Sequence, residues 1–257
     1  MGSPAMFTAV TGASAQQVRI DVIANNLANL GTTGFKASRP SFEDLLYETV
    51  RPPAGEGDSP TGLQFGRGSR VVATERQFSP GTIRQTEQPL DVAIDGKGFL
   101  AVTRLNGDTA YTRDGSLRLD VNGNLVTVEG LQLDPPVTVP TDALEILITA
   151  DGTVSARQPG TGTLTTVGNI LLTSFPNQTG LLAIGGNLYS ETESSGTATP
   201  TTPGQDGAGQ LVQGAPEEAN VNIAEELVNL ILAQRAFEAN TRVISTSDEI
   251  LRFVTQR

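Results

Sequence analysis

The chain contains no cysteine, no histidine and no tryptophan, and Lys36 and Lys97 are its only lysines. Without thiols and imidazoles, neither a disulfide framework nor a cysteine–histidine zinc site can form. Catalytic triads and dyads in which histidine is the general base are excluded for the same reason. Enzymatic chemistry would be left to Asp, Glu, Ser, Tyr, Lys and Arg, which permits a carboxylate-pair hydrolase but removes most other reaction classes.

Positive charge is also scarce. The 257 residues include 17 Lys and Arg against 28 Asp and Glu, which gives a formal net charge of −11. Nucleic acid is therefore not an expected partner, because phosphate binding requires clustered basic side chains. No cofactor or metal is expected either. Gly96-Lys97-Gly98 lacks the spacing of a phosphate-binding loop, and Asp120–Asn124 lacks the glycine position of a calcium loop.

Long apolar runs are missing as well. The most apolar stretches lie near the two ends of the chain, and charged side chains such as Arg19, Asp21, Glu225 and Arg235 interrupt them. We therefore expect no integral membrane segment. The N-terminus lacks the basic region and the long apolar core of a cleaved signal peptide, so an exported chain is expected to keep its N-terminus.

A long helix is predicted at the N-terminal end. Ser3 is a suitable N-cap, Pro4 suits the first helical position, and Gly31–Gly34 contains residues that end a helix. The helix is expected to span residues 4–30. Within it, apolar and small side chains recur at alternating spacings of four and three residues, the pattern of a heptad seam. This seam consists of Met6, Val10, Ala13, Gln17, Ile20, Ala24 and Leu27.

A second long helix is predicted at the C-terminal end. Asn222 is a candidate N-cap, and Glu225 lies three residues later, as in a capping box. No glycine or proline interrupts Val221–Arg257. The same alternation of spacings is sustained along this helix. Its seam consists of Ile223, Leu227, Leu230, Gln234, Phe237, Thr241, Ile244, Asp248 and Leu251.

Short strands are predicted between the helices, where glycine and proline become frequent and β-branched residues occur in short runs. Leu117–Asp120 and Leu125–Val128 flank an Asn-Gly turn, which is typical of a β-hairpin. Two stretches, Pro52–Gly62 and Ser194–Gly209, have the composition of loops or linkers. Further expected strands are Val92–Ile94, Phe99–Thr103, Val137–Val139, Leu144–Thr149 and Asn169–Ser174.

The expected fold class is α+β, with the N- and C-terminal helices paired as a coiled coil, a β-rich middle, and an extended segment after the first helix. We expect residues 1–35 and 218–257 to form a discontinuous helical domain. Residues 36–79 are expected to form the extended segment, and residues 80–217 a compact β-rich outer domain.

Two interpretations of the helical ends stay open. The N-terminal seam is thin, because Ala13, Gln17 and Ala24 bury little apolar area. Apolar flanks on both helices make a face wider than one seam, which implies several helical neighbours. The ends therefore either pair with each other and with copies from other subunits, or form a self-contained helical hairpin under the β-rich domain.

Two sequence motifs carry a family resemblance. Asp21–Asn29, followed by Gly31–Lys36, resembles the N-terminal signature of the bacterial flagellar basal-body rod and hook family. Ala219–Asn222 with Glu225–Val228, followed by Gln234–Asn240, resembles the matching C-terminal signature. Both motifs occur in the family order around a β-rich middle. The N-terminal signature residues are Asn25, Asn26, Leu27, Ala28, Asn29, Gly34 and Phe35.

Within this family, the resemblance to the distal rod members extends over nearly the whole chain. Gly62–Gly66, Val72–Arg76, Asp91–Phe99 and Ala110–Ser116 are similar to segments of those members. A segment after the first helix resembles an extra segment of the distal rod. It consists of Phe42, Glu43, Asp44, Leu45, Leu46 and Tyr47.

The resemblance implies a structural protein and not an enzyme. Such proteins leave the cell interior through the flagellar type III export apparatus, unfolded and uncleaved, and polymerise in the periplasm into a tubular helical assembly. Their end helices line the tube, and the β-rich domain lies outside. The distal rod is a rigid shaft that carries torque from motor to hook for motility. The implied partners are copies of the same chain, the proximal rod and hook proteins, the P- and L-ring bushing and the export apparatus.

The resemblance also gives roles to individual residues. Asn25, Asn26 and Asn29 either bridge adjacent helices and fix their register, as buried asparagine does in coiled coils, or form a solvated polar face. Gly34 is expected to supply a positive φ with Phe35 anchoring the chain, the alternative being a plain loop. The Phe42–Tyr47 segment of the distal rod is a wedge between subunits that stiffens the shaft, the alternative here being a short buried local element.

Other functions stay open at this point. A proximal rod or hook paralogue is the first alternative, although Phe42–Tyr47 argues against the former and the small middle region against the latter. A secreted β-rich carbohydrate hydrolase is a remote alternative from another class. It would need a carboxylate pair in a cleft, and it would leave the end helices without a role.

Overall fold

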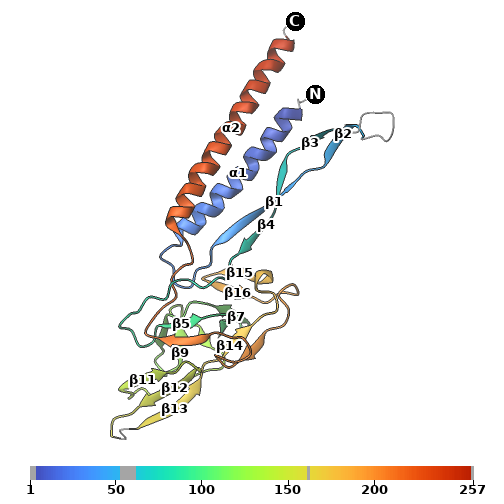
Figure 1. Cartoon of the computed structure of the whole chain (residues 1–257). Helices are drawn as coiled ribbons and strands as arrows, with labels where there is room; N and C mark the ends of the chain where they lie inside the picture. The colour runs from blue at the N-terminus through green and yellow to red at the C-terminus, as the bar shows by residue number, and fades with distance from the viewer. Residues whose placement is uncertain (1–3, 53–61, 161–162, 256–257) are drawn as a thin grey trace. The chain divides into compact units, whose positions relative to one another are not determined.

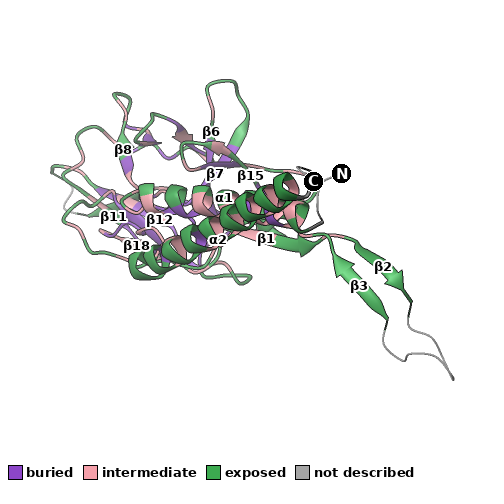
Figure 2. Cartoon of the chain, turned by 90° about the horizontal axis from the view of Figure 1, so that it is seen from above, coloured by how far each residue is buried: buried purple, intermediate pink, exposed green. Residues whose placement is uncertain are grey.

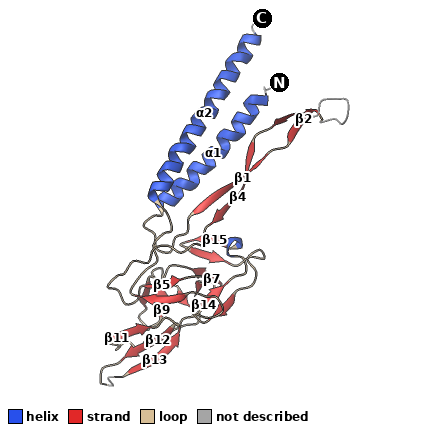
Figure 3. Cartoon of the chain, viewed as in Figure 1, coloured by secondary structure: helices blue, strands red, loops and turns tan. Residues whose placement is uncertain are grey.

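A computed structural model describes residues 4–52, 62–160 and 163–255 of the chain. It confirms the α+β class, because a long helix lies near each end of the chain and strands dominate the region between (Figures 1 and 3). Helix α1 spans Pro4–Ala28 and helix α2 spans Ile223–Thr255. Ser3 and most of the predicted Pro52–Gly62 linker lie outside the described residues.

The chain divides into two compact units. The first, here called the helical unit, combines Met1–Ala28, Ser38–Arg76 and Asn222–Arg257, and the second, the β-rich unit, combines Asn29–Ala37 with Gln77–Val221. This division differs from the three parts expected from the sequence. Residues 38–76 cluster with the helices, and residues 29–37 cluster with the strands.

In the helical unit, α1 and α2 lie side by side, and α1 also contacts a long hairpin (Figure 1). The inner part of the hairpin pairs β1 (Ser38–Asp44) with β4 (Ser69–Arg76) in antiparallel register. Its outer part pairs β2 (Tyr47–Arg51) with β3 (Leu63–Gly66). Gly68 has a φ of +109°, and a Cβ there would lie 2.0 Å from the Thr11 hydroxyl, so only glycine fits against α1.

The N-cap predicted for the second helix is confirmed. The Asn222 side-chain oxygen accepts hydrogen bonds from the backbone N–H groups of Ala224 at 3.1 Å and Glu225 at 3.4 Å. These bonds satisfy donors that have no partner inside the helix. The Glu225 carboxylate accepts a 2.8 Å bond from Arg39 on β1, so the side chain suggested for a capping box joins the helix to the hairpin.

The β-rich unit is built on a nine-stranded sheet. The main path runs β15-β16-β7-β6-β10-β9-β8, and β14 pairs with both β6 and β17. Its strands are β6 (Phe99–Thr103), β7 (Thr109–Thr112), β8 (Leu117–Leu119), β9 (Leu125–Thr127), β10 (Gln132–Leu133), β14 (Leu172–Ser174), β15 (Leu182–Gly185), β16 (Leu188–Ser190) and β17 (Thr199–Thr201).

Two smaller sheets complete the β-rich unit. One pairs β5 (Val92–Asp95) with β18 (Gln210–Gln213), and the other has the order β11-β12-β13, so that β11 is an edge strand. The strands of the second sheet are β11 (Glu145–Ile148), β12 (Thr153–Arg157) and β13 (Leu164–Asn169). A short 3-10 helix spans Gln178–Gly180.

The core of the β-rich unit has an aliphatic and an aromatic part. The aliphatic part collects inward-facing Val, Leu and Ile side chains from the strands, among them Val92, Leu100, Leu117, Leu125, Val154 and Leu172, each fully buried. The aromatic part packs rings edge to face with centroids 4.8–5.8 Å apart, the geometry that aromatic quadrupoles favour. Its members are Phe78, Phe99, Tyr111, Phe175 and Tyr189.

The structure tests the strand predictions. The hairpin around Asn122-Gly123 is confirmed as β8 and β9, with Leu117 opposite Thr127. The strand predicted at Val137–Val139 is wrong, since this segment makes only an isolated bridge through Thr138. The loop or linker predicted at Ser194–Gly209 consists mostly of turns and loop, but strand β17 lies within it. The segment is part of the fold because β17 pairs with β14 and Ser195 is fully buried.

Candidate assembly surfaces and signature residues

Helices α1 and α2 contact each other through small and half-buried side chains. On α1, Ala9, Ala13 and Ile23 are buried, and on α2 Ala233 is fully buried. A Cβ added at Gly12 would lie 3.1 Å from the Asn240 side chain, so the absence of a side chain there permits close approach. The buried stripe is therefore made mainly of small residues and not of large heptad knobs.

The predicted seam residues fall into three groups. Ala13 is buried, and Met6, Ile20, Leu27, Leu230, Phe237, Ile244, Asp248 and Leu251 are half-buried. Val10, Gln17, Ala24, Ile223, Leu227, Gln234 and Thr241 are exposed. Exposed and covered members thus alternate along the N-terminal seam, and from Leu227 to Ile244 in the C-terminal seam. At Val10, Ala24, Leu227 and Gln234, the residue one position closer to the N-terminus is buried instead.

Large apolar side chains remain on the outer faces of both helices, where Figure 2 shows much exposed surface. Soluble monomers rarely expose contiguous apolar patches of this kind unless the patch is an interaction site. The set, here called the outer apolar face, consists of Phe7, Val10, Ile223, Leu227, Val228, Ile231, Leu232, Val243, Ile250 and Phe253.

Asn26 is the signature asparagine that the helical unit buries, with 1% of its surface exposed. Its amide nitrogen donates to the Ser38 carbonyl at 3.0 Å and to Glu226 Oε1 at 3.1 Å, and its oxygen accepts from the Ser38 N–H at 2.9 Å. It therefore ties the end of α1 to the start of β1 and to the first turn of α2. Asn25 is exposed, and half-buried Asn29 accepts a bond from Thr32.

A pocket of about 320 Å³ lies beside Asn26 within the helical unit. Arg19 and Arg39 line it, together with Phe42, Glu225 and Asn229. The Arg19 guanidinium donates to Asn229 at 3.2 Å, and Arg39 pairs with Glu225 at 2.8 Å. Its polar groups bond to one another, so the pocket is a junction of α1, α2 and β1.

The Phe42–Tyr47 segment leads from β1 into β2 and is not buried in its own unit. Five of its six residues are exposed, with Leu46 at 89% and Leu45 half-buried. Glu43 pairs across the hairpin with Arg70 at 2.8 Å. The segment therefore presents apolar side chains to the outside on a strand pair braced by ion pairs.

Gly34 and Phe35 belong to the β-rich unit. Gly34 has a φ of +68°, and a Cβ there would lie 2.6 Å from the Arg113 carbonyl carbon, so this position requires glycine on two grounds. Phe35 is 4% exposed. The predicted turn and anchor are thus both present, with the turn closed by a 2.7 Å bond from the Gly34 N–H to the Glu217 carbonyl.

A buried cluster of charges lies next to this turn. Lys36 Nζ donates to Glu217 Oε1 at 2.7 Å and to the Ser79 carbonyl at 2.7 Å. Arg113 Nε donates to Glu217 Oε2 at 2.9 Å, and the other nitrogens of its guanidinium donate to the carbonyls of Ile94, Gly96 and Gly98. The three charged side chains are at most 1% exposed.

The electrostatics of this cluster favour an ionised carboxylate. Burial alone would raise the pKa of Glu217, but the Arg113 guanidinium and the Lys36 ammonium outweigh it and lower the pKa. Burial lowers the pKa of Lys36, and the neighbouring Arg113 lowers it further, against the pull of Glu217. No sequence pattern links residues so far apart, and the sequence marked Lys36 only as the last residue of a signature.

Comparison with known proteins now decides the family. The chain is 46% identical to the flagellar basal-body rod protein FlgG of Buchnera aphidicola from Acyrthosiphon pisum, over 98% of this chain and 99% of that protein. It is 42% identical to FlgG of Caulobacter vibrioides over 98% of both chains. The chain belongs to the FlgG family of flagellar basal-body rod proteins. The Escherichia coli flagellar hook protein FlgE is similar at a lower level, 24% identical over 95% of this chain.

Three family models match separate parts of the chain. The flagella basal body rod protein model matches residues 6–36, which include most of α1, Asn26 and the Gly34–Lys36 turn. The FlgE/F/G D1 domain model matches residues 93–156, and the model of the C-terminal part of FlgEFG rod proteins matches residues 212–257. Neither helix in the described part of this FlgG family chain is long and apolar enough to cross a membrane.

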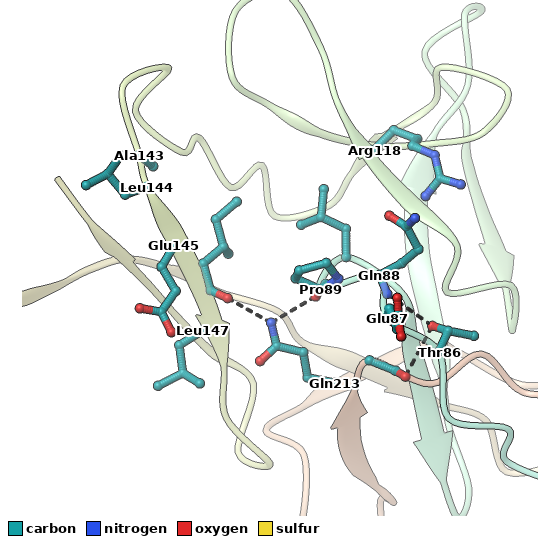
Figure 4. Close-up of a pocket in the computed structure, with 13 residues that line it drawn as sticks. Thr86, Glu87, Gln88, Pro89, Arg118, Ala143, Leu144, Glu145, Leu147 and Gln213 are labelled. Atoms are coloured by element: carbon teal, nitrogen blue, oxygen red, sulfur yellow. Dashed lines mark hydrogen bonds between the residues drawn. The ribbon is translucent and has the colours of Figure 1, made fainter. Parts of the chain in front are cut away.

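A groove of about 570 Å³ lies in the β-rich unit between β11 and the 86–90 segment (Figure 4). The Gln213 side chain projects between them. Its nitrogen donates to the carbonyls of Pro89 and Ile146, both at 2.8 Å, and its oxygen accepts from the Ile148 N–H at 3.0 Å. One side-chain amide thus bonds to the edge of β11 that does not pair with β12. Gln213 belongs to none of the motifs on which the sequence-based prediction rested.

Proposed function

We propose that this protein is a structural subunit of the flagellar distal rod, a non-enzymatic chain that polymerises into a rigid tubular shaft transmitting torque from motor to hook. The observation that carries the proposal is the outer apolar face of α1 and α2. It lies outside the contact between the two helices, so a single chain leaves it in water. The FlgG relatives are named as basal-body rod proteins, in agreement with such a role.

The helices are proposed to pair with each other and with helices of neighbouring copies, in the manner of a coiled coil. The alternation of spacings along both helices supports this arrangement, because two offset stripes can serve two neighbours at once. The small residues Ala9, Gly12 and Ala13 serve the partner within the chain. The larger residues Val10 and Leu227 are then free to pack against another copy.

The Phe42–Tyr47 segment is proposed to be a wedge between neighbouring subunits. Support comes from its exposure, since Leu46 and Tyr47 have little apolar surface to cover them in their own unit. The ion pairs Arg70–Glu43 and Arg67–Glu48 brace the two strands on either side of it. A braced strand pair that carries exposed apolar side chains is suited to resist bending between subunits.

The remaining partners are proposed on the FlgG relationship alone. They are the proximal rod and hook proteins at the two ends of the shaft, the P- and L-ring bushing around it, and the type III export apparatus. The corresponding location is the periplasmic part of the basal body, reached without cleavage of a signal peptide.

The experiment compares polymerisation of the full chain with that of two variants of α2. Ile231→Glu places a charge on the outer apolar face. Ser245→Glu places the same charge on an exposed position of the same helix whose neighbours one turn away are all polar, namely Thr241, Arg242, Asp248 and Glu249. Sedimentation and electron microscopy measure polymer formation, and circular dichroism verifies the fold. We expect Ile231→Glu to abolish polymers and Ser245→Glu to retain them. Equal polymerisation of both variants would contradict the proposal.

A further inference from the structure

The buried charge cluster of the β-rich unit is not balanced. It encloses two cations, Lys36 and Arg113, against the carboxylate of Glu217. Enclosing a cation without a counter-charge is among the most unfavourable steps that folding can meet. The Glu217 carboxylate also accepts a 2.8 Å bond from the Gly81 N–H, so both of its oxygens accept hydrogen bonds within the unit.

The three charges come from distant parts of the chain. Lys36 belongs to the short 29–37 segment, Arg113 follows β7, and Glu217 lies between β18 and α2. Lys36 and Glu217 each stand a few residues from a point where the chain passes into the helical unit, at 37/38 and at 221/222. The cluster therefore joins both chain ends of the β-rich unit to its sheet.

A second set of bonds joins the same two segments. The Asn220 side chain accepts from the Ala37 N–H at 2.7 Å and donates to the Gln77 carbonyl at 2.7 Å. The Gly34 N–H donates to the Glu217 carbonyl. Each segment thus supplies the other with hydrogen-bond partners that a buried backbone requires.

We propose that Glu217 is the closing residue of the β-rich unit: its carboxylate is the counter-charge without which Lys36 and Arg113 cannot be enclosed, so the 29–37 and 216–221 segments dock together or not at all. In any process that delivers the chain N-terminus first, Lys36 and Arg113 arrive long before Glu217. An incomplete chain then holds two cations that must stay in water, and the unit stays open until its last segment arrives.

This device has a consequence for assembly, which rests on the proposed rod function. Residues 28/29 and 221/222 connect the β-rich unit directly to α1 and α2. A subunit whose C-terminal part is still missing would not present a paired set of helices to the growing shaft.

The first test changes the charge of Glu217 in the full chain and leaves its shape. Glu217→Gln removes the counter-charge and keeps one acceptor oxygen, while its NH2 group replaces an oxygen that accepts from Lys36 or Arg113. Glu218→Gln makes the same change in the neighbouring exposed ion pair with Arg84. Urea unfolding is followed by the near-ultraviolet signal of Tyr111 and Tyr189, both buried in this unit. Hydrogen exchange of residues 29–37 and 216–221 is measured by mass spectrometry.

We expect Glu217→Gln to lower the urea midpoint by about 1 M or more and to raise exchange in both segments together. Glu218→Gln should leave both unchanged. Glu217→Gln behaving like Glu218→Gln, or exposing only one of the two segments, would overturn the proposal.

A Lys36 variant keeps the test decisive if Glu217→Gln fails to fold. Lys36→Met leaves one cation and one anion, so it should lower the midpoint much less than Glu217→Gln does. In the double variant Lys36→Met/Glu217→Gln, removal of one unpaired cation should restore part of the loss. A Lys36→Met loss as large as that of Glu217→Gln, or a double variant less stable than both single variants, would refute the role of the counter-charge.

The order of folding is tested by pulse-labelling hydrogen exchange during refolding of the full chain. Amides of 29–37 and 216–221 are expected to gain protection in the same kinetic phase. Protection of 29–37 in an earlier phase would contradict joint docking. Both experiments observe the monomer and not the polymer, so their failure would leave the proposed rod function standing.

Discussion

At the scale of single residues, the Gly34-Phe35-Lys36 signature is a docking segment in which each residue has its own physical reason. Gly34 has positive φ and no room for a Cβ beside the Arg113 backbone. Phe35 buries a ring, and Lys36 brings a charge to Glu217. A side chain at the first position, a polar group at the second or a neutral group at the third would each disturb a different interaction.

The Glu217 cluster predicts that the β-rich unit is sensitive to acid. The pKa of Glu217 is lower in the folded chain than in the unfolded chain, so the unfolded state binds more protons as pH falls below the ordinary carboxyl pKa. The stability that Glu217 contributes is fully present above that ordinary pKa and is lost as pH falls through the lowered value. The Lys36 and Arg113 cations, which face this carboxylate, then repel each other without compensation.

The measurement is the free energy of unfolding of the β-rich unit from pH 7 downward, by urea titration. The acid slope should be steeper in the natural chain than in Glu217→Gln, which cannot titrate at this position. Glu218→Gln should retain the natural slope, since its ion pair with Arg84 is exposed. Identical slopes in the natural chain and in Glu217→Gln would show that other carboxylates govern acid unfolding.

The sequence identified several of these residues but not their partners. Asn26 was recognisable because an amide is unusual in an apolar helical stretch, yet its partner Glu226 is 200 residues away. Lys36 was visible as part of a motif, and Glu217 was visible in no motif at all. Long-range pairing of charges depends on the three-dimensional fold, and a local pattern in one sequence carries no record of it.

At the scale of elements, the spacing of apolar residues predicted that both ends are helical, but not which side of each helix contacts the other. The alternating spacings of four and three residues placed Val10 and Leu227 in the seam. The contact instead uses Ala9, Gly12 and Ala13, because small residues allow the helix axes to approach. Each helix carries two offset stripes of apolar residues. The spacing pattern alone cannot decide which stripe faces the partner helix of the same chain and which faces another neighbour.

The edge of β11 gives a prediction at the same scale. The Gln213 amide satisfies the Ile148 N–H and the Ile146 carbonyl, as a neighbouring strand would. Gln213→Ala removes these bonds and leaves edge groups without their partner, which should cost about 1–3 kcal/mol. Hydrogen exchange should show faster exchange at Ile148.

The matched control is Gln210→Ala on the same strand, where the side chain is exposed. It should leave the exchange of β11 unchanged. A Gln213→Ala chain with natural exchange at Ile148 would indicate that contacts of the groove other than this amide hold β11 in place.

At the scale of the whole molecule, each of the two units is formed by stretches that are separated in the sequence. The chain passes between them at 28/29, 37/38, 76/77 and 221/222. The sequence predicted helical ends around a β-rich middle, because composition changes along the chain mark such regions. It placed residues 29–35 with the helix they follow and residues 36–37 with the extended segment, since only the fold shows that Phe35 and Lys36 are buried in the β-rich unit.

Limited proteolysis of the dilute monomer tests this organisation and the state of the free helices together. The helices expose a wide apolar face and have few large side chains in their mutual contact, so we expect them to open and be cleaved first. The resistant core should extend from about residue 77 to 221. Because Lys36 and Ala37 are held by Glu217 and Asn220, a peptide containing residues 29–37 should remain bound to this core after the chain is cut.

Mass spectrometry of the core under native conditions and after denaturation distinguishes the outcomes. A bound 29–37 peptide that is lost in Glu217→Gln and retained in Glu218→Gln is the expected result. A core without this peptide in the natural chain would mean that the segment docks only while it is covalently continuous with β1. Resistance of the whole chain would instead show that the helical pair is stable alone, and polymerisation would then have to use the outer apolar face without any prior opening of α1 and α2.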